Sequence, residues 1–368
     1  MAARSLLLRY PGRTLVSRVI VDPGGIDRLG RLIGRGAPRR AVVVSEPRVA
    51  ALYSRRVLVS LARARIDAVL VCVPTGERAK TSRQLARLWE QFAAAGLDRH
   101  DLAIALGGGA VGDLTGFAAA TWLRGIDWVG VPTSLLAQVD SSVGGKTAID
   151  LPAGKNLTGA FHQPALVVAD PSVLATLPTR HLKAGLAEVV KQGMAVDATL
   201  FRYVERHAEA LLACDTRALA EVVVRSVRAK ARVTQADERE REGGRRTALN
   251  LGHTLAHALE ACLGYRHLLH GEAVAVGLRV AARLSLEEAG LPPDVRRRQD
   301  ELLDRLGLNA RIPGVRIGAL LESMRRDKKG RNGKIRWVLT PRLGHASVPR
   351  LVPSRRIEAA LLDAGARR

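Results

Sequence analysis

The first half of the chain alternates short apolar segments with segments of helical periodicity, and this alternation constrains the fold more than any other feature. Short apolar runs predict buried strands, and apolar residues three and four positions apart predict helices. The predicted strands are 16–21, 41–45, 66–73 and 101–106, and the predicted helices are 26–33, 49–64, 82–95 and 112–122. Strands that alternate with helices predict a parallel, doubly wound α/β domain.

Beyond about Pro178 the strand signals fade and helical spacing dominates. The expected helices are 182–194, 218–236, 251–262, 272–288 and 295–306, and one late strand is expected at 334–339. A chain of 368 residues commonly forms two domains. We therefore predict an α/β domain over residues 1–178 and a mostly helical domain over residues 179–368.

Composition excludes two classes of protein. No apolar run reaches the roughly 18 residues that a membrane helix needs, and the N-terminal residues lack the pattern of a signal peptide. The three cysteines, Cys72, Cys214 and Cys262, are widely spaced and form no CxxC pair. We therefore expect no disulfide framework and a reducing, cytoplasmic location.

The net charge of +23 raises the alternative of a nucleic-acid-binding protein. Aromatic residues make up only 3% of the chain, and the arginines are scattered in short runs, so nucleic acid is not the expected partner. A solvated, arginine-biased surface that attracts anionic substrates fits better. Only 9 of the 58 basic residues are lysines, which suggests that each lysine stands where a compact ammonium is needed.

A glycine-rich turn follows the predicted strand at 101–106. Gly107, Gly109 and Gly112 fit the pattern G-x-G-x-x-G and precede a predicted helix. Such a turn presents backbone N–H groups and a helix N-terminus to a pyrophosphate. The pattern alone is weak, because an ordinary strand–helix turn has the same form and the usual acidic residue about 20 positions later is missing.

A second glycine segment, Gly144-Gly145-Lys146-Thr147, ends like a Walker A loop. Asp140 stands where the first glycine of that motif is required, so an ATP-binding loop is excluded. The segment nevertheless gathers polar residues in a loop suited to an anionic, hydroxylated ligand. These are Asp140, Ser141, Ser142, Lys146, Lys155 and Asn156.

Histidines are concentrated in one stretch. Four of the nine, namely His253, His257, His267 and His270, lie within 18 residues. His253 and His257 are four positions apart on one predicted helix face, which is a spacing typical of metal sites. Imidazoles with one carboxylate suit zinc or a similar divalent ion. The spacing leaves the carboxylate open. The candidates are Glu188, Glu260 and Glu272.

Several long segments stand out in the chain: GGGAVGDLTGF from Gly107, the run TWLRGIDWVGVPTSLLAQVDSSVGGKTAIDLPAGKN, TLPTRHLKAGLAEVVKQG, LNLGHTLAHALE, LLHGEAVAVG and the late MRRDKKG. Together these segments resemble the 3-dehydroquinate synthases, over nearly the whole chain. The resemblance implies a Rossmann-like NAD-binding domain, a helical metal- and substrate-binding domain, and an active site in the cleft between them.

The resemblance also implies the site residues. It selects Glu188, His253 and His270 as ligands of one zinc or cobalt ion, and makes His257 a neighbour of the substrate. The NAD contacts it implies are Glu46, Glu77, Lys80, Gly108, Gly109, Asp113, Thr133, Ser134, Lys155 and Thr176. The substrate contacts it implies are Asp140, Lys146, Asn156, Lys191, Lys230, Glu242, Arg246, Asn250 and one of Lys328 and Lys329. Arg124 resembles a residue that reaches across a dimer interface, so a homodimer is expected.

Two departures from the family pattern bear on these roles. The chain is two residues longer than usual before Arg246, so either Lys230 or Arg232 fills one substrate position, and the helical pattern favours Lys230. Gln192 stands beside Lys191 where an aromatic residue is commoner. The sequence offers no functional account of Gln192.

The implied reaction converts 3-deoxy-D-arabino-heptulosonate 7-phosphate to 3-dehydroquinate and phosphate, with NAD recycled in place. A sugar phosphate cyclase of secondary metabolism, taking an amino analogue or sedoheptulose 7-phosphate, is one alternative. Arg246 disfavours the second substrate, which lacks a carboxylate. A metal-dependent polyol dehydrogenase is another alternative, but it would not need Lys146, Lys230 and Arg246 together.

Overall fold

The structure is a computed structural model that describes residues 2–9, 16–34, 38–241, 244–265, 267–326 and 334–368. Three residues assigned to substrate above, Glu242, Lys328 and Lys329, lie outside the described residues. The chain divides into two compact units. The first comprises Met1–Leu177 and Leu219–Ala231, and the second comprises Pro178–Ala218 and Arg232–Arg368.

The first unit is built on a seven-stranded sheet within the described residues, in the order β1-β2-β9-β6-β5-β3-β4. The strands are β1 (Arg4–Arg9), β2 (Val16–Val21), β3 (Arg40–Ser45), β4 (Asp67–Cys72), β5 (Leu102–Gly107), β6 (Trp128–Pro132) and β9 (Leu166–Ala169). All neighbours pair in parallel except β1, which pairs antiparallel with β2 at the edge. The expected parallel α/β half is therefore confirmed.

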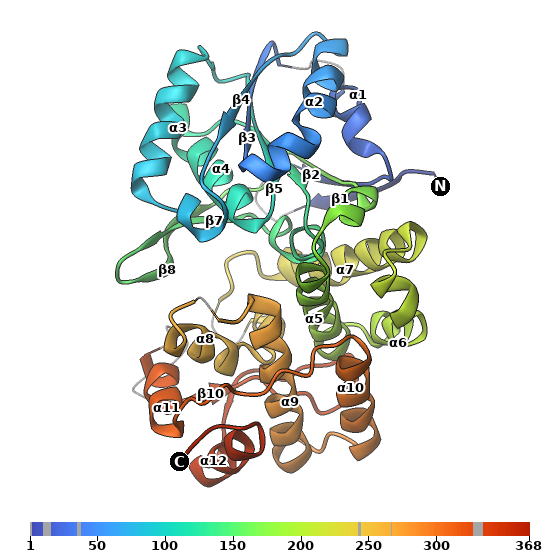
Figure 1. Ribbon diagram of the computed structural model, residues 1–368, viewed down its shortest axis with the longest axis vertical. Helices are drawn as coiled ribbons and strands as arrows, with labels where there is room; N and C mark the ends of the chain where they lie inside the picture. Colours follow the sequence, from blue (N-terminus) through green and yellow to red (C-terminus); the bar gives the residue numbers. More distant parts are fainter. Residues whose placement is uncertain (1, 10–15, 35–37, 242–243, 266, 327–333) are drawn as a thin grey trace. The chain divides into compact units, whose positions relative to one another are not determined.

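Helices cover both faces of this sheet (Figure 1). They are α1 (Leu29–Ile33), α2 (Pro47–Arg63), α3 (Ser82–Ala94) and α4 (Gly109–Thr121). Because side chains alternate along a strand, Val42 and Val44 of β3 pack with α3 and α4, whereas Val43 packs with α1 and α2. Because both faces of the sheet are buried, the sequences of these strands are continuous apolar runs and do not alternate apolar with polar residues.

The sequence-based prediction missed strands β1, β6 and β9 of this sheet and one hairpin of the first unit. The Leu6-Leu7-Leu8 run forms β1, a strand that the periodicity did not predict. The glycine-rich segment around Gly144 leads into an antiparallel hairpin of β7 (Lys146–Leu151) and β8 (Gly154–Phe161), which forms a separate two-stranded sheet. Lys155 and Asn156 therefore lie on a hairpin strand rather than in an irregular loop.

The second unit is mostly helical, as expected. Its helices are α5 (Thr179–Ala195), α6 (Ala198–Leu212), α8 (His253–Cys262), α9 (His270–Glu288), α10 (Pro293–Arg305), α11 (Ile317–Arg326) and α12 (Ser354–Asp363). Helix α7 (Thr216–Ala236) contributes its ends to this unit and Leu219–Ala231 to the first. Among the described helices, none is long and apolar enough to cross a membrane.

The strand predicted at 334–339 is longer than the strand that forms there. Only β10 (Arg336–Trp337) forms, paired antiparallel with β11 (Arg350–Leu351). Val338 and Leu339 are buried, but the backbone beyond Trp337 bonds elsewhere, with the Thr340 N–H donating to Ser285 Oγ at 2.9 Å. Their apolar character therefore reflects burial against helices and not a longer strand.

Candidate active site

The glycine turn of the first unit joins a buried strand to a helix N-terminus. Strand β5 ends at Gly107, Gly108 precedes the helix, and α4 begins at Gly109. The first N–H groups of a helix have no partner within the helix and favour a bound anion. A Cβ atom at Gly112 would meet nothing within 4 Å, so the backbone is open there. The turn borders a pocket that Asp113 and Lys146 also line.

Sheet order places further candidates beside this turn. Strands β3 and β6 flank β5, and Glu46 and Thr133 directly follow these two strands. The Thr133 N–H donates to the Gly107 carbonyl at 2.9 Å, and Ser134 follows it at the same edge. The sequence lacks the usual acidic residue about 20 positions after the turn. Glu46, which comes earlier in the chain, places an acidic side chain at the same sheet edge instead.

Lys80 is the centre of a polar cluster in the first unit. Its side chain is 3% exposed, and Nζ lies 2.7 Å from Asp113 Oδ2 and 3.7 Å from Glu77 Oε2. It also donates to Asn156 Oδ1, and Lys155 Nζ lies 3.6 Å from Glu77 Oε1. Five residues that the sequence suggested separately are therefore brought together.

Charge and burial oppose each other in this cluster. Burial would lower the pKa of Lys80, but the charges of Asp113 and Glu77 outweigh it and raise that pKa. Lys80 stays an ammonium at neutral pH and can act as a fixed donor. Asp150, which the sequence reasoning missed, lies 3.8 Å from Lys80 Nζ and accepts from the Asn156 N–H at 2.8 Å.

Lys230 and Arg232 have different surroundings. Lys230, on α7, is 6% exposed, and its Nζ lies 2.9 Å from Asp140 Oδ1 and donates to the Asp140 carbonyl at 2.5 Å. Arg232 is exposed and pairs with Asp197, the residue that caps α6. Of the two, Lys230 is therefore the one that shares a cluster with another candidate residue.

Three candidates of the first unit lie at its surface. Lys146 is exposed at the start of β7. Arg124 is exposed in a turn where both Leu123 and Arg124 adopt positive φ angles of 49° and 67°. Thr176 is exposed, and its Oγ1 lies 2.5 Å from the Tyr53 hydroxyl.

Glu188, His253 and His270 come together in the second unit. Glu188 lies in the middle of α5, whereas His253 and His270 are the first residues of α8 and α9. Two glycines permit this approach. A Cβ on Gly271 would lie 1.9 Å from the Ala184 carbonyl oxygen of α5, and one on Gly252 would lie 2.9 Å from the Leu278 nitrogen of α9.

The three side chains face one another as metal ligands do. One donor atom of each lies within 4.8 Å of the others. His253 Nε2 and His270 Nε2 lie 3.6 Å and 3.2 Å from Glu188 Oε1. The two Nδ1 atoms face the Leu251 carbonyl and Glu260 Oε1, each at 3.3 Å. If Nδ1 carries the proton in both rings, both Nε2 lone pairs are left to bind a cation.

Glu188 is held as a carboxylate at this place. It is fully buried, and Lys191 Nζ lies 2.5 Å from Oε2. Burial would raise the pKa of Glu188, but the Lys191 charge and the contact with His270 outweigh it and lower the pKa to about 2. Neither carboxylate oxygen has a hydrogen bond of ordinary geometry. A buried, ionised oxygen of this kind fits a metal ligand.

The other members of the histidine-rich stretch have different positions. The ring of His257 lies 5.3 Å from that of His253 and 6.3 Å from that of His270, one turn further along α8. Glu260 contacts the far side of His270. Glu272 is bound by Arg180 and by the Leu269 N–H. Within the described residues, only Glu188 supplies a carboxylate to the clustered donor atoms.

Arg246 and Asn250 lie on the short helix that precedes α8. Arg246 is 3% exposed and its guanidinium donates to the Glu238 carbonyl, and Asn250 Nδ2 donates to Glu240 Oε1 at 2.6 Å. Glu240 was missed by the sequence reasoning, and it adopts a positive φ of 52°, which is uncommon for a residue other than glycine.

A glycine turn at a helix N-terminus in one unit and a Glu-His-His cluster in the other are typical of enzymes that bind a dinucleotide and a divalent metal. Residues 70–184 match the 3-dehydroquinate synthase N-terminal family, and residues 185–330 match the 3-dehydroquinate synthase C-terminal family. The chain belongs to the 3-dehydroquinate synthase family.

Individual proteins agree with this assignment. The 3-dehydroquinate synthase of Pelobacter propionicus is 47% identical over 90% of this chain and 92% of its own length. The structure resembles 2-epi-5-epi-valiolone synthase of Streptomyces hygroscopicus subsp. jinggangensis, solved with NAD+ and Zn2+, with 27% identity, a TM-score of 0.84, and coverage of 94% and 96% of the two chains. It shares its fold with 2-deoxy-scyllo-inosose synthase, solved with carbaglucose-6-phosphate, NAD+ and Co2+, at 23% identity, a TM-score of 0.89, and coverage of 98% and 100%.

Proposed function

We propose that the chain converts 3-deoxy-D-arabino-heptulosonate 7-phosphate to 3-dehydroquinate and phosphate, a carbon–oxygen lyase reaction, with NAD and one zinc or cobalt ion. The observation that carries this proposal is the cluster of Glu188, His253 and His270, in which both histidine Nε2 atoms face one oxygen of the buried Glu188 carboxylate. The sequence kinship to 3-dehydroquinate synthases supports the choice of substrate.

The side chains of Glu188, His253 and His270 are chemically suited to bind a divalent metal ion. Two imidazole nitrogens and one ionised carboxylate are preferred by zinc and related ions, and three protein ligands leave room for oxygen atoms of a substrate. When bound, the ion would supply Lewis acidity to sugar hydroxyls, and NAD would supply a reversible acceptor of hydride. Lys191 keeps Glu188 ionised and adds positive charge beside it. We propose that His257 takes part in proton transfer close to the substrate.

The first unit fits a dinucleotide. We propose that the turn at Gly108, Gly109 and Gly112 receives the pyrophosphate, and that Glu46 accepts a hydrogen bond from a ribose hydroxyl. Lys80, held by Asp113 at 2.7 Å, is a charged donor beside the same turn. The remaining proposed contacts are Glu77, Thr133, Ser134, Lys155 and Thr176.

The substrate carries a carboxylate and a phosphate, and both need cations. We propose Lys146, Lys230 and Arg246 as donors of charge-assisted hydrogen bonds to the carboxylate. Asn156, Asn250, His257 and Arg124 are proposed for the phosphate, and Asp140 for a hydroxyl. The side-chain oxygen of Asn156 faces Lys80 in this structure, so a phosphate role requires its Nδ2 to face the ligand.

We further propose a homodimer to which Arg124 contributes. Leu123 is 51% exposed, and two adjacent non-glycine residues keep left-handed backbone angles in that turn. A strained, exposed turn of this kind is consistent with a contact surface.

The three cysteines are free, which is consistent with a reducing compartment such as the cytoplasm.

The decisive experiment compares substrates with and without the carboxylate. Metal-loaded protein with NAD is given the heptulosonate phosphate or sedoheptulose 7-phosphate, and phosphate release is measured. We expect release from the first substrate at a kcat/KM at least about 100-fold higher, because the second lacks the carboxylate that Lys146, Lys230 and Arg246 are proposed to bind. Equal or reversed preference would contradict the proposal and favour a cyclase like 2-epi-5-epi-valiolone synthase, the alternative that the structural likeness supports.

A further inference from the structure

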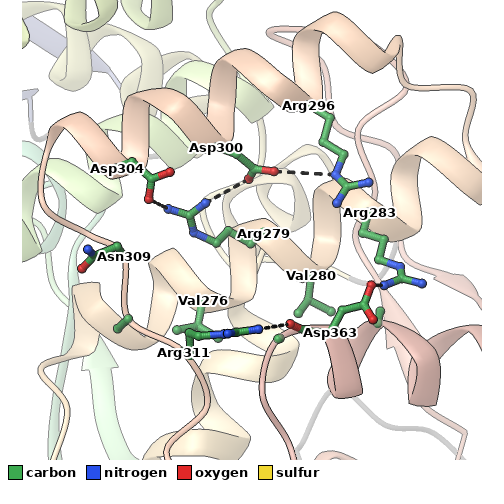
Figure 2. Close-up of a pocket in the computed structure, with 13 residues that line it drawn as sticks. Val276, Arg279, Val280, Arg283, Arg296, Asp300, Asp304, Asn309, Arg311 and Asp363 are labelled. Carbon is green, nitrogen blue, oxygen red and sulfur yellow. Dashed lines mark hydrogen bonds and ion pairs between the residues drawn. The ribbon is translucent and has the colours of Figure 1, made fainter.

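A cavity of about 280 Å³ lies in the second unit, away from every residue assigned above. It is bounded by α9, α10, the segment 309–311 and the end of α12 (Figure 2). Val276 and Val280 of α9 form apolar wall, and charged side chains surround them. Arg279 follows the proposed metal ligand His270 by nine residues on α9. Arg279, which lines the cavity, therefore lies roughly 13 Å along that helix from His270.

Four arginines and three aspartates line this cavity. Arg279 Nη2 lies 2.7 Å from Asp304 Oδ1, and its Nη1 lies 3.4 Å from Asp300 Oδ1. Arg296 is 3.6 Å from Asp300, and Arg283 pairs with Asp363. The fourth arginine, Arg311, comes from the segment 309–311. The lining therefore carries one more positive than negative charge.

Arg311 differs from the other three arginines. Its Nη2 donates to the backbone carbonyl of Asp363 at 2.9 Å. Among the residues that the structure describes, no carboxylate lies within ion-pair distance of its guanidinium. Figure 2 shows the Arg311 side chain along one wall of the cavity, with Arg279 and its two aspartates on another. A planar guanidinium of this kind retains donors for a carboxylate or phosphate ligand.

We propose that this cavity binds a small organic oxyanion, a carboxylate or a phosphate ester with a short apolar body. Arg311 and Arg279 bind the oxyanion head, and Val276 and Val280 contact the apolar body. The existing ion pairs do not oppose this binding strongly, because partly exposed pairs each contribute only about 0–1 kcal/mol and can rearrange around a ligand. The site is separate from the catalytic set and does not depend on the proposed reaction.

The test is calorimetric titration of the full-length protein with three probes: inorganic phosphate, benzoate and phenyl phosphate. Inorganic phosphate offers the head alone, whereas the other two add an apolar body. We expect Arg311→Gln to weaken binding of benzoate or phenyl phosphate about tenfold or more, as the loss of one charge-assisted hydrogen bond predicts. Arg311→Lys should retain part of the affinity, because it keeps the charge.

The matched control is Arg297→Gln. Arg297 lies on α10, is 71% exposed, and pairs only with Glu301 within the described residues. This control separates loss of a site from loss of general surface charge, and unfolding temperatures verify that each variant folds. Arg279→Gln is a second variant on another wall. If neither Arg311→Gln nor Arg279→Gln changes the affinity for any probe, or if Arg297→Gln weakens it equally, the proposal is wrong. If only inorganic phosphate depends on Arg311, the apolar body is not recognised and the organic ligand class is wrong.

Discussion

Glu260 Oε1 lies 3.3 Å from His270 Nδ1, on the side of the ring opposite the Nε2 atom that faces Glu188. The Glu260 side chain is buried, and its carboxylate contacts the Nδ1 atom of His270. A partner of this kind fixes the tautomer and orientation of a histidine ligand and raises its basicity. We therefore infer that Glu260, which the sequence left as one of three alternative ligands, positions His270 instead of binding the metal.

Glu260→Gln is expected to weaken zinc or cobalt binding about 10- to 100-fold, because the ring of His270 loses a charged partner. Metal affinity is measured by competition with a chelator. The control is Glu209→Gln, since Glu209 is a carboxylate of α6 that pairs with Arg305 and is not part of the Glu188, His253 and His270 cluster. Unchanged metal affinity in Glu260→Gln would remove the positioning role.

Lys230 should be needed for turnover, whereas Arg232 should not. Lys230 is buried against Asp140, and Arg232 is exposed. We expect Lys230→Met to lower kcat/KM for the heptulosonate phosphate about 100-fold, as the loss of a strong ionic contact implies. Arg232→Gln should stay within about twofold of the parent, because exposed pairs contribute little. The opposite order would exchange the two assignments.

Lys80 should act on the dinucleotide. Lys80→Met is expected to weaken NAD binding about tenfold, because a charged donor beside the glycine turn is lost and Asp113 is left without its partner. Fluorescence titration with NADH measures this directly. Lys155→Met should have a smaller effect, since Lys155 is more exposed and lies 3.6 Å from Glu77. An equal effect of both variants would mean that only net charge matters.

Glu205 gives a pH-dependent prediction for stability. Arg298 donates two hydrogen bonds of 2.8 Å to this carboxylate and lowers its pKa below the ordinary value of 4.5. The ionised form is therefore favoured by folding. Its contribution, about 1 kcal/mol, is complete above pH 4.5 and is lost as the pH falls through the lower, folded-state pKa.

Urea unfolding of Glu205→Gln checks this sign. The variant should be less stable than the parent at pH 7, and the two should converge in acid, where Glu205 is neutral in both states. Glu301→Gln is the control, because the exposed pair of Glu301 with Arg297 is 3.7 Å apart and should contribute little at any pH. A difference that persists unchanged in acid would show that packing, and not the ion pair, carries the effect.

The sequence predicted those features that depend on local pattern. Strands β2 to β5 and helices α1 to α4 of the first unit follow from apolar runs and helical spacing, and the histidine-rich stretch indicated a metal site. Strands β6 and β9 were not predicted. The choice of Glu188 over Glu260 and Glu272 did not follow from spacing, because it depends on the approach of α5 to the starts of α8 and α9. That approach is permitted by Gly252 and Gly271.

Other features depend on contacts between distant segments, and the sequence pattern does not reveal them. Glu46 lies beside the glycine turn because β3 pairs with β5, although the two are separated by β4 and two helices along the chain. Lys230 meets Asp140 over a separation of 90 residues. Strand β1 was missed because a short run of leucines between arginines has no clear period, and only its pairing with β2 makes it a strand.

The central claim is that NAD is used and restored within one turnover. The most direct measurement follows phosphate, NADH and product together, with metal-loaded protein, the heptulosonate phosphate and less NAD than substrate. We predict one phosphate and one 3-dehydroquinate per substrate consumed, with many turnovers per NAD and no net NADH. Accumulation of NADH in proportion to substrate, without release of phosphate, would contradict the account and assign the chain to the dehydrogenases.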